Sequence, residues 1–132
     1  MARTTVDEML AAARSRLDRV DPAQAAGAVQ AGDAVLIDIR AESQIAQDGT
    51  IPGAVVIGRN VLEWRLDPTS SRPHPQAPEL DQQVIVICNE GYASSLAAVS
   101  LQELGFTRAT DLDGGFKAWR AAGLPVQARA PQ

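Results

Sequence analysis

Residues 84–94 read Val-Ile-Val-Ile-Cys-Asn-Glu-Gly-Tyr-Ala-Ser, and the class of fold can be inferred from this segment and its neighbours. Four consecutive β-branched residues predict a strand that is buried on both faces. After Ser94, apolar residues recur at helical spacing as far as Gly105, a residue type that commonly ends helices. Cys88, the one cysteine of the chain, is therefore expected where a buried strand turns into a helix.

Outward from this stretch, short apolar runs alternate with helical patterns. Further strands are expected at 34–39, 54–57 and 109–112, and helices at 5–19, 22–31, 40–47, 60–66 and 116–122. Thr5, Asp21, Asn60 and Ser94 are the expected helix N-caps. The proline-rich residues 67–80 are expected to form an irregular surface excursion. The alternation predicts one α/β domain, a mainly parallel sheet with helices on both faces.

Composition excludes several classes of function. The chain has 132 residues, of which 45% are hydrophobic and 21% charged, which suits one globular domain. A net charge of -4 gives no reason to expect a nucleic-acid partner, and no apolar run of about 20 residues predicts a membrane span. Charged residues interrupt the first 20 positions, so no signal peptide is expected, and the single cysteine fits a reducing, cytoplasmic setting. One cysteine and one histidine cannot form a Cys/His zinc site, and no metal or cofactor is expected.

The position of Cys88 suggests a chemical role. Loop amides and a helix N-terminus that point at a sulfur stabilise the thiolate over the thiol. Gly91 allows the loop to turn through backbone angles that other residues avoid. The opposing interpretation is a small buried hydrophobe at a strand end, which free cysteines often are. Position alone leaves both interpretations open.

Four motifs occur in the order and spacing typical of one family. They are Asp38-Ile39-Arg40, residues 49–54 (Gly-Thr-Ile-Pro-Gly-Ala), Cys88-x-x-Gly91, and residues 114–126 with Gly-Gly-Phe-x-x-Trp and Gly-Leu-Pro-Val. Together they resemble the rhodanese-like domain over residues 19–127. Residues 1–18 then form an N-terminal helical extension, and residues 128–132 a short tail.

The resemblance implies a three-layer fold, with a parallel five-stranded sheet between helices, and sulfurtransferase activity. Cys88 would take a sulfane sulfur from a donor such as thiosulfate or a persulfide, and pass it to cyanide, a small thiol or a protein thiol. The amides of the active-site loop would stabilise the charge on the transferred sulfur. That loop comprises Asn89, Glu90, Gly91, Tyr92, Ala93 and Ser94.

The chain also departs from the family pattern. Many members carry an arginine where this chain has Ala93, and Glu90 adds a negative charge that disfavours a nearby thiolate and a dianionic donor. The histidine of the second motif is Thr50 here. The candidate supporting residues are Asp38, Arg40, Arg59 and Arg65. Of these, Arg40 is expected to pair within the fold, whereas Arg59 and Arg65 are candidates to supply the missing positive charge.

Two alternatives to sulfur transfer belong to other classes. A cysteine-dependent phosphatase needs an arginine six residues after the cysteine to bind phosphate, and this chain has Ser94 there. A non-catalytic rhodanese-like module, for binding or for sulfur or redox sensing, is consistent with the uncharged-to-acidic loop. Retention of both Cys88 and Gly91 favours sulfur transfer over pure binding.

Overall fold

Strand β3 (Gln83–Ile87) is the centre of the sheet in the computed structural model, which describes residues 2–129. β1 (Ala34–Asp38) pairs with one side of β3, and β4 (Ala109–Asp111) pairs with its other side. β2 (Val55–Val56) extends the sheet beyond β1. The order is β2-β1-β3-β4, and every pairing is parallel. The carboxyl ends of β1, β3 and β4 therefore lie at one edge of the sheet, where ligand sites form in such folds.

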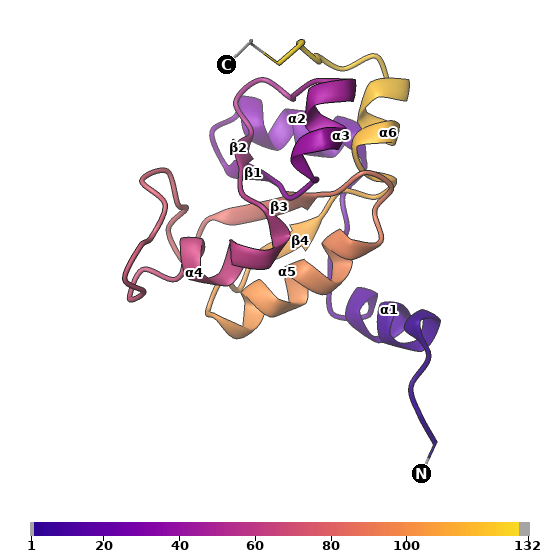
Figure 1. Ribbon diagram of the computed structural model, residues 1–132, viewed down its shortest axis with the longest axis vertical. Coiled ribbons are helices and arrows are strands. Elements are labelled where there is room, and N and C mark those ends of the chain that lie inside the picture. Colours follow the sequence, from indigo (N-terminus) through magenta and orange to yellow (C-terminus); the bar gives the residue numbers. More distant parts are fainter. Residues whose placement is uncertain (1, 130–132) are drawn as a thin grey trace.

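Helices cover both faces of the sheet (Figure 1). α2 (Pro22–Gln30), α3 (Glu42–Asp48) and α6 (Gly115–Ala121) lie on one face, and α4 (Leu62–Leu66) and α5 (Ala93–Glu103) on the other. Alternate residues of β3 supply the two cores: Ile85 and Ile87 face α2 and α6, whereas Val84 and Val86 face α4 and α5. This arrangement confirms the predicted three-layer α/β class.

The sheet has four strands in the described residues 2–129, so the expected fifth strand is wrong. The segment ahead of α2 reaches the outer side of β4 through one residue, Val20, which forms an isolated parallel bridge with Leu112. The next residues, Asp21 and Pro22, already begin α2. Because proline has no backbone N–H to donate to the sheet, the pairing ends after that bridge.

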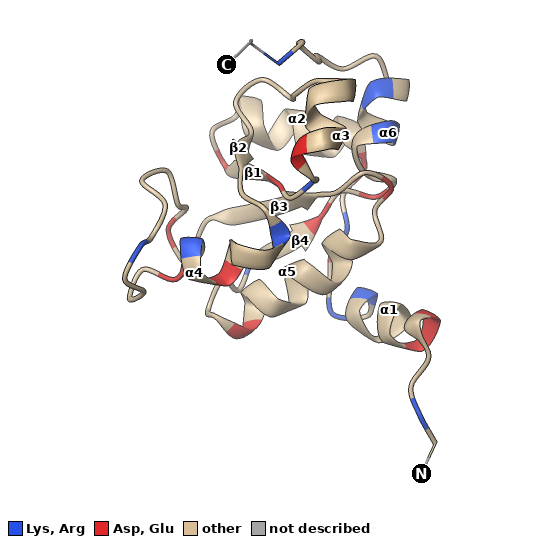
Figure 2. Cartoon of the chain, viewed as in Figure 1, with Lys and Arg blue, Asp and Glu red and all other residues tan. Residues whose placement is uncertain are grey.

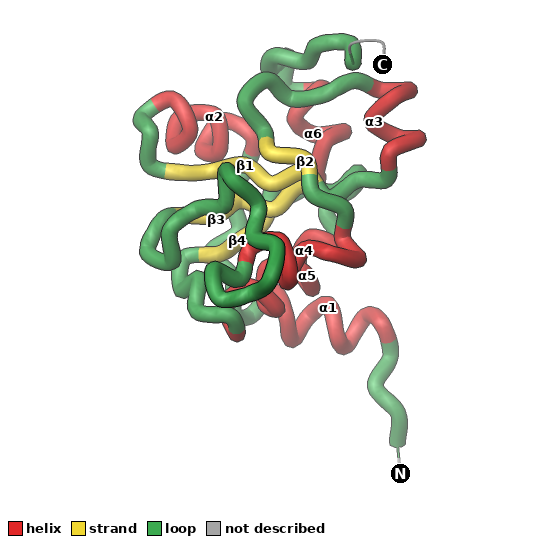
Figure 3. The backbone as a smooth tube through the Cα atoms, turned by 60° about the vertical axis from the view of Figure 1, so that its left-hand side comes forward, coloured by secondary structure: helices red, strands yellow, loops and turns green. Residues whose placement is uncertain are grey.

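The N-terminal helix α1 (Val6–Arg14) packs against α5, and Figures 1 and 3 both show it outside the main layers. Thr5 caps it in a reciprocal capping box with Glu8. The helix ends at Arg14, five residues before the predicted end at 19. Residues 15–20 turn instead toward the sheet edge, where the Val20 N–H donates to the Asp111 carbonyl at 3.2 Å.

Several predicted boundaries also differ from the structure. β2 is shorter than the predicted strand 54–57, and α3 begins at Glu42 instead of residue 40. Asn60 caps no helix, because it lies inside the 3-10 helix η1 (Arg59–Val61) that precedes α4. Ser94 lies inside the first turn of α5, and Tyr92 occupies the N-cap position.

No helix in residues 2–129 is long and apolar enough to cross a membrane. The predicted tail 128–132 falls partly outside the described residues.

Candidate active site

Cys88 follows β3 directly, and its sulfur is held by backbone amides. The Sγ accepts hydrogen bonds from the N–H of Gly91 at 3.1 Å and from the N–H of Ser94 at 3.4 Å. Helix α5 starts one residue before Ser94 and carries no charged side chain ahead of Glu103, at its far end (Figure 2). The partial positive charge of the α5 N-terminus is therefore directed toward Sγ without competition from charged residues in the first turns of the helix.

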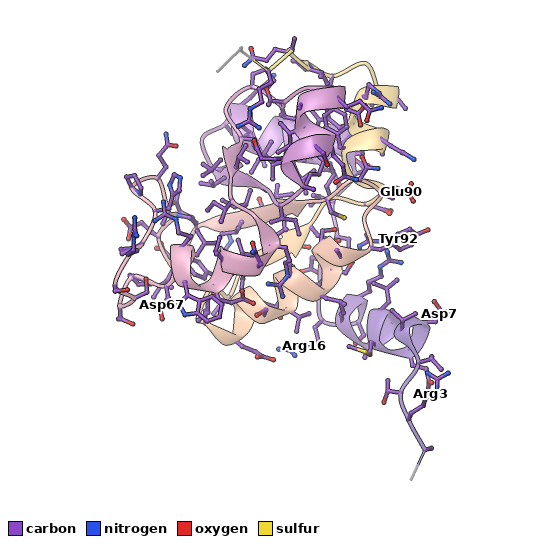
Figure 4. The ribbon with its side chains drawn as sticks, viewed as in Figure 1. Arg3, Asp7, Arg16, Asp67, Glu90 and Tyr92 are labelled. Carbon is purple, nitrogen blue, oxygen red and sulfur yellow. The ribbon has the colours of Figure 1, made fainter. Side chains whose placement is uncertain are left out.

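A pocket of about 360 Å³ opens beside Cys88. Its walls come from the segment after β1, including Ile39 and Arg40, from Arg59, and from loop residues 88–90, 92 and 93. Cys88 is 8% exposed and lies in the wall of this pocket, so a small donor can reach its sulfur. Figure 4 shows Glu90 and Tyr92 on the outer side of the loop, with Tyr92 extending into solvent. The pocket opens beside a nearly buried sulfur, which argues against a purely structural role for Cys88.

The N-terminus of α6 fixes the first half of the loop. The Phe116 N–H donates to the Cys88 carbonyl at 2.8 Å, and the Lys117 N–H donates to the Asn89 carbonyl at 3.1 Å. Gly115 makes this approach possible, since a Cβ there would lie 2.5 Å from the Cys88 carbonyl oxygen. The Gly-Gly-Phe motif is therefore explained by a close backbone contact with the cysteine loop.

The carbonyl orientations leave amides available inside the loop. In a trans peptide the C=O and the following N–H point in opposite directions. Because the Asn89 carbonyl faces α6, the Glu90 N–H points away from α6. Within residues 2–129, the N–H groups of Glu90, Tyr92 and Ala93 have no hydrogen-bond acceptor. These amides can bind a negatively charged group next to Cys88.

Two arginines from the N-terminal segment hold the second half of the loop. The Gly91 carbonyl accepts from Arg14 Nη2 at 2.8 Å and from Arg19 Nη2 at 3.0 Å. Arg14 also donates to Ser95 Oγ at 3.2 Å and lies 5.7 Å from the centre of the Tyr92 ring. No local motif marks these arginines in the sequence, because their partners lie 72 to 92 positions away.

Asp111, at the end of β4, organises the region under the loop. This fully buried carboxylate accepts bonds of 2.7 Å from both Ser94 Oγ and Ser95 Oγ. Arg19 binds it with two nitrogens, at 2.9 and 3.2 Å. Partial burial of Arg19 lowers its pKa, but the hydrogen bond with Asp111 and the negative charges of Asp111 and Asp113 outweigh that effect and raise the pKa of Arg19. Arg19 therefore stays charged beside the loop.

The candidate supporting residues divide into two groups. Arg40 is buried against Asp38, with its Nη2 at 2.7 Å from the carboxylate and 2.8 Å from the Gly49 carbonyl, as expected for a pair within the fold. Arg59 lines the pocket, and its half-exposed side chain pairs with Glu63 at 2.9 Å. Arg65 donates to the Arg72 carbonyl and does not line the pocket in the described structure. The structure thus brings Arg40 and Arg59 to the pocket, but not Arg65.

Two acidic residues near the pocket have cationic partners. Glu90 pairs with Lys117 of α6 at 2.6 Å on the surface, which reduces the negative charge expected beside the sulfur. Burial of Glu63 opposes its ionisation, but the hydrogen bond from Ser100 and the charge of Arg59 together lower the pKa of Glu63. Glu63 therefore stays ionised, and its negative charge partly neutralises the positive charge of Arg59.

The fold and the cysteine loop define a class, and comparisons with known proteins agree with it. The sequence model of the rhodanese-like domain matches residues 21–122. The thiosulfate sulfurtransferase GlpE of Pseudomonas savastanoi pv. phaseolicola is 35% identical over 103 residues, which cover 78% of this chain and 87% of that protein. The chain belongs to the rhodanese-like domain family.

Solved structures extend the comparison. The human single-domain sulfurtransferase TSTD1 is 26% identical, with a TM-score of 0.65 over 78% of this chain and 95% of that one. RPA3614 from Rhodopseudomonas palustris, a protein of unknown function described as a possible tyrosine phosphatase, is 35% identical. Its TM-score is 0.85 over 96% of this chain and 99% of that one. The likeness to RPA3614 thus extends over almost the whole chain.

Proposed function

We propose that this chain is a sulfurtransferase in which Cys88 carries the transferred sulfur as a persulfide. The strongest support is that two backbone amides donate hydrogen bonds to Sγ in the wall of an open pocket. Relatives named sulfurtransferase and thiosulfate sulfurtransferase support it.

The proposed reaction has two displacement steps. The Cys88 thiolate attacks the outer sulfur of thiosulfate, the sulfur–sulfur bond of the donor breaks, and sulfite leaves with the bonding electron pair. With a persulfide donor, a thiolate leaves instead. An acceptor thiolate or cyanide then attacks the terminal sulfur of the Cys88 persulfide, and Cys88 departs as a thiolate. No external oxidant or reductant is required, because both steps only pass a sulfane sulfur between nucleophiles.

The loop backbone supplies the electrostatic part of the mechanism. The Gly91 and Ser94 amides stabilise the attacking thiolate, and the N–H groups of Glu90, Tyr92 and Ala93 are available to the terminal sulfur of the persulfide. Preorganised donors of this kind each contribute about 2.7–4 kcal/mol in the oxyanion holes of acyl-transfer enzymes. The amides would perform the task that a loop arginine performs in other members.

The charge of the pocket indicates which donor and acceptor suit it. Arg59 is the half-exposed cation of the pocket, and its pairing with Glu63 weakens its attraction for a dianion. The reacting group of a thiol-borne persulfide carries at most one negative charge, whereas thiosulfate carries two, so a persulfide group suits this pocket better. Cyanide, a small thiol or a protein thiol would accept the sulfur. We place this chemistry in the cytoplasm, where a single free thiol stays reduced.

A phosphatase function has little support, although one structural neighbour is described as a possible tyrosine phosphatase. The sixth residue after Cys88 is Ser94, whose hydroxyl donates to Asp111 at 2.7 Å and whose side chain is buried. No guanidinium occupies the loop itself to bind phosphoryl oxygens. The stronger alternative is a rhodanese-like binding or sensing module, which would hold sulfur or a partner without turnover.

Intact-mass spectrometry separates these functions. The reduced protein would be incubated with thiosulfate, and separately with glutathione persulfide, then weighed and treated with cyanide. We expect a gain of about 32 Da, one sulfur atom, that cyanide removes as thiocyanate. The Cys88→Ala variant, checked for folding by circular dichroism, should show no gain. A folded, reduced protein that takes sulfur from neither donor would contradict the proposal and favour the binding module.

A further inference from the structure

Two arginines of the segment ahead of the family match converge on one atom of the reactive loop, the Gly91 carbonyl oxygen. Both Arg14 and Arg19 donate to this oxygen, at 2.8 and 3.0 Å. Both lie outside residues 21–122, so the family match does not cover them. Gly91 has a φ of +88°, and a Cβ there would lie 2.8 Å from the Gly114 nitrogen, so the loop passes tightly between the arginines and α6.

We propose that Arg14 and Arg19 are positioning residues that clamp the Gly91–Tyr92 peptide, so that its N–H faces the sulfur carried by Cys88. The peptide is trans, and a carbonyl directed at the two guanidinium groups therefore turns the Tyr92 N–H away from them. That N–H has no acceptor within residues 2–129, and Tyr92 lines the pocket beside Cys88. This inference deepens the proposed sulfur transfer and rests on it.

Glycine makes such a clamp necessary. A glycine adopts positive and negative φ with similar ease, so the loop on its own has no strong preference for one orientation of this peptide. Two charged hydrogen bonds to one carbonyl oxygen give it that preference, since bonds to charged groups contribute more than neutral ones.

The side chains of Asp111 and Ser95 hold the two arginines in place. Arg19 is held by both oxygens of Asp111, and the Asp111 carboxylate also binds the hydroxyls of Ser94 and Ser95 at the start of α5. Arg14 bonds Ser95 Oγ at 3.2 Å. One buried carboxylate thus ties the clamp and the N-terminus of α5 into a single unit. The two guanidinium groups also bring positive charge near a loop that contains none.

The test uses the full chain with Arg14→Met, Arg19→Met and Arg19→Lys. The matched control is Arg16→Met, because Arg16 lies between Arg14 and Arg19 in the sequence. Its side chain is exposed, forms a 3.9 Å ion pair with Glu103, and extends away from the Tyr92 loop in Figure 4. Two rates are measured: alkylation of Cys88 by iodoacetamide at fixed pH, and single-turnover persulfide formation with glutathione persulfide. Melting temperatures and circular dichroism establish that each variant is folded.

We expect persulfide formation to slow by about tenfold or more in Arg14→Met and Arg19→Met, because a displaced reacting group loses rate steeply. Alkylation should slow in the same variants, Arg19→Lys should recover part of both rates, and Arg16→Met should match the unmodified protein. Unchanged rates in folded Arg14→Met would overturn the clamp, even if Arg19→Met failed to fold. If the unmodified protein formed no persulfide, the proposed function would fail, while the alkylation rates would still test the clamp.

Discussion

Two aspartate–arginine pairs occupy equivalent places in the fold and serve different ends. Asp38 ends β1 and binds Arg40, which donates to the Gly49 carbonyl at 2.8 Å. Asp111 ends β4 and binds Arg19, which donates to the Gly91 carbonyl at 3.0 Å. Both glycines have a positive φ, +92° and +88°. Each pair thus uses a carboxylate at a strand end and a guanidinium to fix a glycine turn.

The difference between the pairs lies in distance along the chain and in burial. Arg40 is two residues from its aspartate, is completely enclosed, and stacks 3.8 Å from the centre of the Phe116 ring. Arg19 reaches its aspartate from 92 residues away, and its side chain is 17% exposed. The first pair stabilises a turn of the scaffold, whereas the second reaches the reactive loop. The same chemical device can therefore support the fold or the site, depending on which glycine it binds.

The largest effect is expected from breaking the buried pair. Asp38→Ala should lower the free energy of unfolding by about 3–5 kcal/mol, because it leaves Arg40 charged and enclosed without a carboxylate. Urea denaturation followed by circular dichroism measures this loss. The double variant Asp38→Leu/Arg40→Met should recover much of the stability, since it removes both charges. If Asp38→Ala lowered the free energy of unfolding by less than about 1 kcal/mol, the pair would not be what stabilises the Gly49 turn.

The two glycine turns are expected to differ in their effect on activity. A Cβ at Gly49 would lie 2.7 Å from the Gln127 carbonyl oxygen, and one at Gly91 would lie 2.8 Å from the Gly114 nitrogen, so both alanine variants force a strained φ and a clash. Each should lose about 1–3 kcal/mol of stability. Folded Gly49→Ala should keep its rate of persulfide formation, whereas Gly91→Ala should lose most of it. Equal rates in the two variants would argue against a special role for the Gly91 turn.

The smallest effect concerns the exposed pair of Glu90 and Lys117. Exposed ion pairs contribute little to folding, so Lys117→Met should change stability by less than about 1 kcal/mol. It leaves Glu90 unpaired beside the pocket, and the kcat/KM for thiosulfate should fall by about two- to fivefold at low salt. The deficit should disappear at about 1 M salt, where the Debye length is about 3 Å. A deficit that persists in high salt would point to a contact other than charge.

Local features were predictable from the sequence, and distant ones were not. The β-branched run before Cys88 and the helical spacing after it predicted the turn that carries the cysteine. The short spacing of Asp38 and Arg40 allowed their pairing to be expected. The sequence does not predict the clamp on Gly91, because the clamp joins three separate segments. Its arginines, its serines and Asp111 come together only when the N-terminal segment, α5 and β4 pack. The prediction of Ser94 as an N-cap is wrong for the same reason, since its hydroxyl donates to the distant Asp111.

The strand lengths have a consequence for association with other chains. The two long strands, β1 and β3, lie inside the sheet, and its edges are formed by β2, with two residues, and β4, with three. The bridge at Val20 occupies part of the outer side of β4, and Pro22 ends that pairing. Short, interrupted edges present few unpaired N–H and C=O groups for another strand to join. These short edge strands thus reduce the risk of edge-to-edge aggregation.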